Sequence, residues 1–155
     1  MLTRLLRPHA DHAYAILRVM TGLMLSFHGL QKIFGVLAEA QPPVMSQLWI
    51  GGVIEIVCGW AIALGVLTTY AAFLASGTMA VAYTQFHWGL ATDGRFFPAV
   101  NHGELALVYA FLFLFVACRG AGPWSVDEWR HMKSTSSMSK TRVPEGAPGR
   151  VGLSP

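Results

Sequence analysis

The chain has 155 residues, of which 54% are hydrophobic and only 12% are charged, and its net charge is +3 at pH 7. Soluble domains average about 25% charged residues, so this composition excludes an ordinary soluble domain, and the high apolar content excludes a disordered chain. Only seven charged side chains lie between residues 13 and 118, namely Arg18, Lys32, Glu39, Glu55, Asp93, Arg95 and Glu104. The composition therefore predicts an integral membrane protein.

The apolar middle of the chain, residues 14–120, is long enough for four membrane-spanning helices, because one span needs about 20 residues. We expect the spans at about residues 14–36, 47–67, 70–90 and 101–118. Pro42 and Pro43 separate the first two spans, and Ser46 is suited to cap the second. These elements predict an all-α membrane protein, an up-down-up-down bundle of four transmembrane helices.

Basic residues gather at the two ends of the chain, in residues 1–13 and after residue 118. Four spans put both ends on one side of the membrane, and the positive-inside rule places that side in the cytoplasm. The same distribution favours membrane flanks over nucleic-acid binding. We expect residues 121–130 to form a segment at the membrane interface, with Ser125 as a helix cap, and residues 131–155 to be a disordered cytoplasmic tail.

Most of the polar residues in the middle of the chain are predicted to lie at one depth. With a rise of about 1.5 Å per helical residue, four helices place them in the outer half of the bundle: His28, Lys32, Glu55, His87, His102 and Glu104. Arg18 alone falls near the cytoplasmic end. Charges inside a membrane are costly, so this layer predicts either a functional site or a structural lock.

Helical spacing supports a shared interior for this layer. His28 and Lys32 are four residues apart, so they share one face of the first span. Glu55 lies midway between Gly51 and Gly59, and these small residues are expected to let a neighbouring helix approach the carboxylate. Both patterns favour side chains that face the inside of the bundle.

Some of these residues also have simpler interpretations. Lys32 paired with Glu55 or Glu104 could be an ion pair that only fixes helix register. His87, four residues after Tyr83 on the third span, could be an interfacial side chain that faces water. These alternatives stay open at the level of the sequence.

Haem and disulfide chemistry have weak support in the sequence. His28 and His87 are expected at similar depth, so a bis-histidine haem site is conceivable, but no spacing demands it. Cys58 and Cys118 are expected to differ in depth by about 15 Å, which is too far for a disulfide. We expect no haem, no metal site and no disulfide.

Four short motifs follow one another along the chain: Arg18 ahead of residues 28–35 (HGLQKIFG), residues 51–55 (GGVIE) with Gly59 and Gly65, residues 101–107 (NHGELAL), and residues 122–127 (GPWSVD). Together they resemble the motifs of the DoxX family. His102 stands where the family pattern has glycine. The resemblance covers about residues 14–128, and the order and spacing of the motifs make it specific.

The resemblance implies a four-helix protein of the bacterial inner membrane, related to subunits of thiosulfate:quinone oxidoreductases or terminal quinol oxidases. It favours a quinone-linked accessory subunit that acts with a soluble or membrane redox partner protein and has a quinone as its cofactor. The candidate ligand-binding or proton-handling residues are His28, Lys32, Glu55, Asn101 and Glu104, with Arg18, Tyr83, His87 and His102 as a second group.

Two other classes of function stay open. A non-catalytic membrane module would bind a lipid or small hydrophobic ligand, or scaffold partner enzymes, and it could form a homo-oligomer. A transporter of a small solute would use the same polar layer, but the sequence has no broken helix or inverted repeat typical of transporters. The sequence alone does not decide whether the protein is an enzyme.

Overall fold

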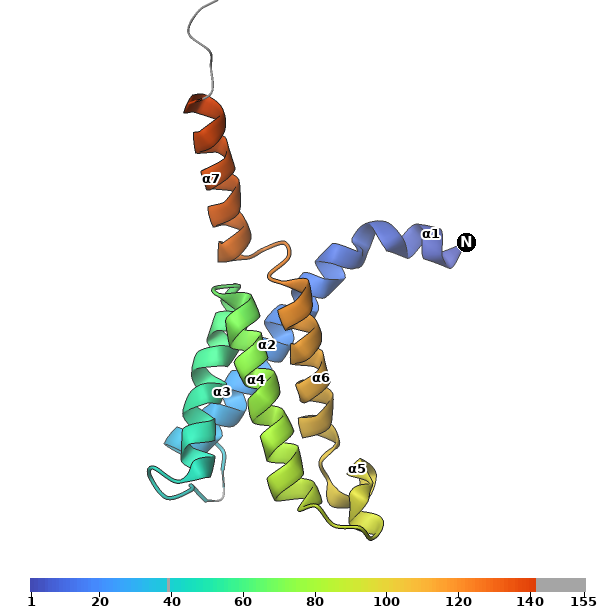
Figure 1. Cartoon of the computed structure of the whole chain (residues 1–155), viewed down its shortest axis with the longest axis vertical. Helices are drawn as coiled ribbons and strands as arrows, with labels where there is room; N and C mark the ends of the chain where they lie inside the picture. Colours follow the sequence, from blue (N-terminus) through green and yellow to red (C-terminus); the bar gives the residue numbers. More distant parts are fainter. Residues whose placement is uncertain (39, 142–155) are drawn as a thin grey trace, which may run out of the picture.

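The computed structural model describes residues 1–38 and 40–141, with side chains described as far as residue 135. Within this part of the chain every regular element is helical (Figure 1). The elements are α1 (Leu2–Leu6), η1 (Arg7–His9), α2 (Ala10–Phe34), α3 (Gln47–Leu64), α4 (Thr68–Ala82), η2 (Tyr83–Trp88), η3 (Gly94–Phe96), α5 (Pro98–Asn101), α6 (Glu104–Arg119) and α7 (Val126–Thr141). Of the short elements, η2 is a π-helix. The predicted all-α fold class is confirmed.

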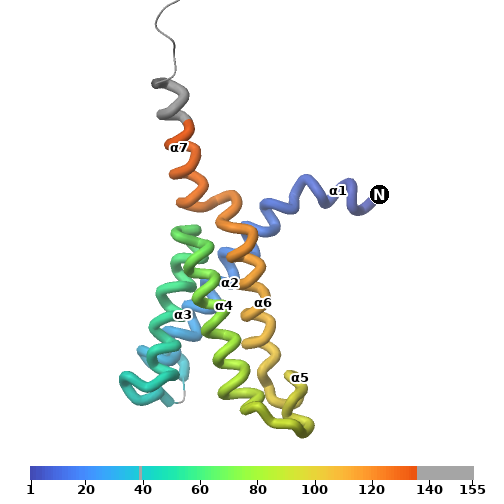
Figure 2. The backbone as a smooth tube through the Cα atoms, in the orientation of Figure 1, coloured from blue at the N-terminus to red at the C-terminus, as the bar shows by residue number. Residues whose placement is uncertain are grey.

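Helices α2, α3, α4 and α6 lie side by side and alternate in direction (Figures 1 and 2). Helix α2 packs along α3, α3 along α4, and α4 along α6. The start of α2, the α3–α4 turn and the α6–α7 connection lie at one end of this bundle, which we call the terminal end. The loops before α3 and before α6 lie at the opposite end, which we call the loop end.

Two of the described helices are long and apolar enough to cross a membrane by length and composition. They are the continuous helix Leu2–Phe34 and α3, Gln47–Leu64. Helix α4 has 15 residues and is continued by the six residues of η2, and α6 has 16 residues. A single span needs about 20 residues, so the bundle combines two helices of sufficient length with two that fall short of it as α-helices.

Large apolar side chains cover the outside of the bundle. Tyr70, Phe73 and Phe111 are 76%, 67% and 66% exposed, and Val57 on α3 is 63% exposed. A soluble protein buries most side chains of this kind, because water solvates them poorly. The exterior therefore fits a lipid environment, where helices satisfy their own backbone and present apolar side chains outward.

Glycines bring α2 and α3 into backbone contact. A Cβ atom placed on Gly22 would lie 2.7 Å from the Gly59 carbonyl oxygen, and one on Gly29 would lie 2.5 Å from the Gly52 carbonyl oxygen. The prediction that Gly59 admits a neighbouring helix is therefore confirmed. The same prediction for Gly51 is wrong, because no atom lies within 4 Å of its Cβ position. One residue further around the helix, Gly52 takes that role.

The first two bundle helices end close to the predicted positions. Ser46 caps α3 as predicted, since its hydroxyl accepts a hydrogen bond from Trp49 N at 3.3 Å. Gly35 and Gly65 end α2 and α3 with φ of 67° and 70°, a left-handed conformation that favours glycine. Helix α1 and η1 lead directly into α2, so most of the predicted N-terminal segment, residues 1–13, is helical.

The third and fourth spans differ from their predicted bounds at the loop end. The third, expected over residues 70–90, is α4 followed by the π-helix η2. The fourth, expected from Asn101, begins at Glu104. Asn101 instead ends the short helix α5, and His102 adopts a left-handed φ of 57° that interrupts the helix. Glu104 lies in the first turn of α6, as predicted, whereas His102 precedes it.

Helix α7 projects away from the bundle at the terminal end (Figure 1). Ser125 caps it as predicted, since its hydroxyl accepts a hydrogen bond from Glu128 N at 3.2 Å. The helix continues to Thr141, so the disorder predicted from residue 131 is wrong as far as residue 141. The mainly polar sequence of α7 offers no apolar pattern from which the helix could be recognised. Residues 142–155 of the predicted tail lie outside the described residues.

Candidate functional site

A cavity of about 260 Å³ lies near the loop end, among α2, α3, the α4–η2 helix and α6. Its lining residues are His28, Lys32, Glu55, Met79, Ala82, His87, His102, Leu105, Ala106 and Tyr109. Five of them were candidates from the sequence: His28, Lys32, Glu55, His87 and His102. The structure thus gathers most of the predicted polar layer around one cavity.

An ion pair between α2 and α3 forms one wall of this cavity. Lys32 Nζ donates to Glu55 Oε1, so Lys32 pairs with Glu55 and not with Glu104. The lysine side chain is 30% exposed and that of Glu55 only 3%. Glu55 Oε2 is buried and has no hydrogen-bond partner among the described residues. An unsatisfied buried carboxylate oxygen is costly, so this atom can accept a hydrogen bond from a bound molecule.

Tyr109 on α6 brings a second unsatisfied group to the cavity. Its hydroxyl is buried without a hydrogen-bond partner in the described part of the chain. The ring lies edge-on to His28, with 6.4 Å between ring centroids, and stacks on Phe113 at 5.3 Å. Sequence reasoning missed Tyr109, although the spacing of Ala106, Tyr109 and Phe113 marks the inner face of a helix.

The π-helix η2 positions Tyr83 and His87. A π-helix is rare and is frequent at functional sites. His87 Nδ1 lies 3.2 Å from the Asn101 carbonyl oxygen, and the Tyr83 hydroxyl donates to the Phe96 carbonyl oxygen at 3.2 Å. His87 therefore lines the cavity while contacting the following loop, whereas the Tyr83 hydroxyl holds that loop in place.

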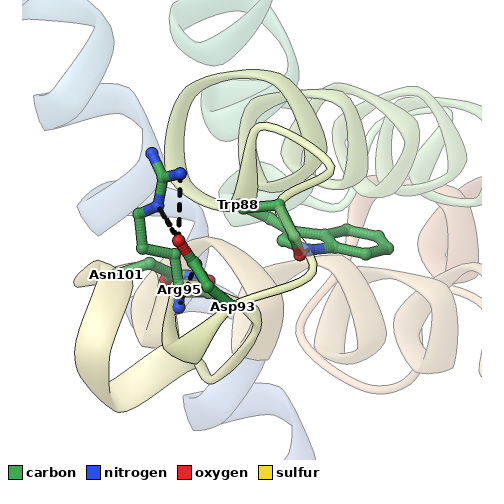
Figure 3. A network of polar contacts seen from close by, with 5 residues as sticks. Trp88, Asp93, Arg95 and Asn101 are labelled. Carbon is green, nitrogen blue, oxygen red and sulfur yellow. Dashed lines mark hydrogen bonds and ion pairs between the residues drawn. The ribbon is translucent and has the colours of Figure 1, made fainter.

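Two other sequence candidates do not line the cavity. Asn101 organises the loop: its Oδ1 accepts from Gly103 N at 2.8 Å, and its Nδ2 donates to the Arg95 carbonyl oxygen at 2.8 Å. Figure 3 shows Asn101 beside Arg95, whose side chain also pairs with Asp93 and lowers the pKa of the Asp93 carboxyl by hydrogen bonding. Glu104 is exposed in the first turn of α6.

Arg18 lies at the opposite, terminal end and is fully buried. Its guanidinium donates to four backbone carbonyls, those of Ile62 at 2.5 Å, Ala63 at 3.0 Å, Pro123 at 3.3 Å and Trp124 at 2.9 Å. The first two belong to the last turn of α3, where the helix dipole favours a cation and each carbonyl oxygen has room for a further hydrogen bond. Arg18 thus joins α2, α3 and the α6–α7 connection, and it does not reach the cavity.

Asp127, which was not a candidate from the sequence, completes this end. Its Oδ1 accepts from Leu67 N at 3.0 Å, and its Oδ2 accepts from both Thr68 N and Thr68 Oγ1 at 2.9 Å. Burial raises the pKa of this carboxyl, but the hydrogen bonds lower it further, so the net pKa lies below the usual value. The signal that could have found it is an acidic residue in the first turn after the Ser125 cap. We call Arg18, Asp127 and their partners the terminal clamp.

A larger groove of about 420 Å³ runs along the face between α3 and α4. Its apolar lining residues include Leu48, Ile50, Ile54, Phe73, Leu74, Val81 and Phe86. The groove shares Lys32, Glu55 and Ala82 with the cavity. The polar cavity and this α3–α4 groove therefore meet at the Lys32–Glu55 ion pair.

The cavity offers hydrogen-bonding groups suited to a small polar ring. Glu55 Oε2 can accept and the Tyr109 hydroxyl can donate, which fits a quinone carbonyl or a quinol hydroxyl. No group of three or more His, Cys, Asp or Glu side chains in the described part of the chain is placed to hold a metal ion. Cys58 is a buried free thiol and Cys118 an exposed one.

Comparison with known proteins agrees with the motifs. The sequence profile of the DoxX family matches residues 13–88, which include Arg18, His28, Lys32, Glu55 and His87. An uncharacterized protein of Haemophilus influenzae is 37% identical over 131 residues, a region that covers 79% of this chain and 93% of that protein. No solved structure matches the chain. From the profile match and the motifs that it contains, we conclude that the chain belongs to the DoxX family.

Proposed function

We propose that this DoxX-family membrane protein binds a quinone head group in the cavity and serves as an accessory subunit of a quinone-dependent oxidoreductase complex. The observation that carries the proposal is that two residues lining one cavity each carry an unsatisfied buried group, Glu55 Oε2 and the Tyr109 hydroxyl. A quinol hydroxyl can donate to Glu55 Oε2 and can accept from the Tyr109 hydroxyl, so the reduced head group satisfies both groups. The oxidised quinone offers only acceptors and pairs with the Tyr109 hydroxyl alone. A purely apolar ligand would leave both groups unsatisfied.

The ionisable side chains around the cavity can also hold and move a proton. A bound quinone would supply two-electron redox chemistry coupled to proton transfer. Glu55 Oε2 can accept a proton from a ligand hydroxyl, while Lys32 holds the carboxylate in place through Oε1. His28 and His87 add imidazoles to the lining, and each imidazole has one ring nitrogen that can donate and one that can accept a hydrogen bond.

We expect a partner protein to carry the electron donor. The sequence has two cysteines and no glycine-rich dinucleotide loop, so it contains no recognisable motif for an electron-carrying cofactor. Helix α7 projects from the terminal end (Figure 1), where it is placed to contact such a partner. The partner would then carry the electron donor, and this chain would hold the quinone.

We place all four bundle helices in the bacterial inner membrane, with both termini in the cytoplasm. Basic side chains of the described residues gather toward the terminal end, among them Arg4, Arg7, Arg119, Arg130 and Lys133. The positive-inside rule assigns this end to the cytoplasm. The cavity, near the loop end, then lies toward the outer face of the membrane.

The test is purification in mild detergent, followed by optical spectroscopy and mass spectrometry of the extracted lipids. We expect quinone to co-purify with the wild-type protein and to be lost from Glu55→Gln and Tyr109→Phe. The matched controls Glu128→Gln and Tyr70→Phe alter exposed side chains outside the cavity and should retain it. Folded wild-type protein with neither quinone nor a redox-active partner would contradict the proposal.

A non-catalytic lipid-binding module is the second candidate function. The observation in its favour is the apolar α3–α4 groove, because acyl chains also fit such a surface. Stoichiometric phospholipid in place of quinone, in the same extraction, would support this alternative.

A further inference from the structure

Glycines of the bundle fall into two groups with different surroundings. Gly22, Gly29 and Gly59 lie in the α2–α3 contact, where a Cβ atom would meet backbone atoms within 2.7 Å. Gly51 and Gly77 lie within α3 and α4, yet no atom lies within 4 Å of their Cβ positions. Glycine weakens a helix interior, so helix packing explains the first group and does not explain the second. Both members of the second group line the α3–α4 groove.

The groove is bridged toward the loop end and open toward the side of the bundle. Gln47 Nε2 donates to Gln85 Oε1 at 2.5 Å, which links α3 to η2. Phe73 and Leu74, 67% and 51% exposed, line the open side. In a membrane this side faces lipid, so a molecule that moves along the groove reaches the cavity from the bilayer.

We propose that the α3–α4 groove holds the isoprenoid chain of the ligand and is its path from the bilayer into the cavity, with Gly51 and Gly77 keeping that path open. This inference rests on the proposed function, because the head group must occupy the cavity. Lys32 and Glu55 line both spaces. A head group bound at this ion pair therefore leaves its chain in the groove.

Charge at the junction favours a neutral head group over a phosphate. Lys32 is the one lysine or arginine among the residues that line the two spaces, and it is already paired with Glu55. A phospholipid phosphate placed there would face the unpaired Glu55 Oε2, and two like charges repel strongly in a medium of low dielectric constant. A ring hydroxyl donates to that oxygen instead, and the carbonyl of an oxidised ring carries no net charge, so neither form brings a second full negative charge to the site. The occupant of the groove is therefore the chain of a neutral, ring-headed lipid.

Leucine at Gly51 or Gly77 fills the groove while leaving the helix contacts intact, because both positions face open space. Leucine also has a higher helix propensity than glycine, so these variants are expected to fold. Alanine at the same positions fills less of the groove. Ala80→Leu is the matched control, since Ala80 is exposed on α4 and does not line the groove.

The probes are ubiquinone-2, which has a short isoprenoid chain, and ubiquinone-0, which is the head group alone. Each is titrated against the full chain in phosphatidylcholine nanodiscs, with quenching of tryptophan fluorescence as the readout. We expect Gly51→Leu and Gly77→Leu to weaken ubiquinone-2 binding at least about tenfold, because losing the burial of about two methylenes has this effect. Ubiquinone-0 binding should not change, the alanine variants should show smaller losses, and Ala80→Leu should show none.

The two proposals fail in different ways in this experiment. Unchanged ubiquinone-2 binding in both leucine variants would overturn the groove assignment and leave the head-group site standing. An equal loss of affinity for ubiquinone-2 and ubiquinone-0 would also overturn the groove assignment, because the substitutions would then not act specifically on the binding of the isoprenoid chain. Failure of the wild-type protein to bind either probe would overturn the proposed function and the groove assignment with it.

Discussion

The terminal clamp and the cavity contain equally buried charges that differ in how completely they are satisfied. Arg18 is 0% exposed and donates to four backbone carbonyls, with only its Nε unpaired. Glu55 is 2% exposed, and one of its two oxygens has no partner. The chain completes the clamp with its own backbone and leaves the cavity incomplete. This difference supports a structural role for the clamp and supports the proposal that a ligand completes the cavity.

The source of the partners explains why the two regions differ. At the clamp, all four acceptors are backbone carbonyls, and the two at the end of α3 belong to a helix terminus, where carbonyls lack intrahelical partners. In the cavity, the polar groups are side chains from separate helices, and no helix end depends on them. At the terminal clamp, the fold itself thus offsets the cost of burying a charge. In the cavity, the proposed ligand would offset that cost.

Replacing Arg18 by glutamine should have the largest effect on stability. Glutamine has two N–H donors where arginine has five, so at least two of the four carbonyls lose the hydrogen bond from this side chain. We expect the free energy of unfolding to fall by about 4 kcal/mol, measured by denaturant titration in detergent. The control Arg119→Gln removes a partly exposed cation paired with the exposed Asp11 and should cost less than about 1 kcal/mol. Equal losses in the two variants would contradict a structural role for the clamp.

Removing the lysine from the cavity ion pair should have the next largest effect. Lys32→Met leaves the Glu55 carboxylate buried without any partner, and we expect a loss of about 3 kcal/mol. Adding Glu55→Gln removes the uncompensated charge and should restore most of the stability, which a double-mutant cycle measures.

The same double variant distinguishes a lock from a site. Restored folding without co-purified quinone would show that the Lys32–Glu55 pair acts on the ligand. Restored folding with quinone retained would make the pair a structural lock, and the contrast between the two ends of the bundle would disappear.

Asp127→Asn should have a smaller effect at the clamp. The amide keeps one acceptor oxygen but loses the second and the negative charge at the start of α4, so we expect a loss of about 1 kcal/mol at neutral pH. Because the folded pKa of Asp127 lies below its ordinary value of 3.8, its contribution is complete above that value and is lost as the pH falls through the folded pKa. Wild type and variant should therefore converge in stability below about pH 4. A difference that stays constant down to acid pH would contradict this assignment.

The main helices could be predicted from the apolar length that a membrane span requires. The elements whose geometry depends on local packing could not. Apolar runs, the Ser46 cap and the glycines after α2 and α3 mark helices whose ends follow from backbone chemistry. The π-helix η2 has no such mark, because its geometry depends on the loop that packs against it. The left-handed His102 was equally hidden, since a histidine carries no preference for that conformation strong enough to be recognised.

The candidate site was predictable in depth but not in direction. Counting residues along each span grouped His28, Lys32, Glu55 and His87 correctly, because the rise of a helix is fixed. Counting residues could not distinguish Glu104 from the residues that line the cavity. Glu104 has a similar depth but is exposed and does not line the cavity, and depth does not determine the angle around the helix axis. Tyr109 was missed because the search followed charge, and its hydroxyl is neutral.

The smallest effect in the comparison between clamp and cavity is expected at His102, a residue that has a strained backbone and also lines the cavity. Its φ of 57° lies in the left-handed region, which is unfavourable for a residue with a Cβ, and its side chain lines the cavity. His102→Gly should relieve the strain and raise the free energy of unfolding by about 1 kcal/mol. It should also weaken quinone binding by a factor of about two to three, a loss of less than one hydrogen bond.

The matched control for this change lies at the other end of the bundle. Leu67 has a φ of 48° next to the terminal clamp, and its backbone N–H, which donates to Asp127, is preserved in Leu67→Gly. Thermal unfolding should show a similar gain for both variants, while quinone titration should show a loss only for His102→Gly. The strained backbone of Leu67 at the clamp would then have no effect on ligand binding. The strained backbone of His102 would instead hold its imidazole in the position that favours binding. If His102→Gly gains stability and keeps full quinone affinity, the polar function of the cavity belongs to Glu55 and Tyr109 without His102.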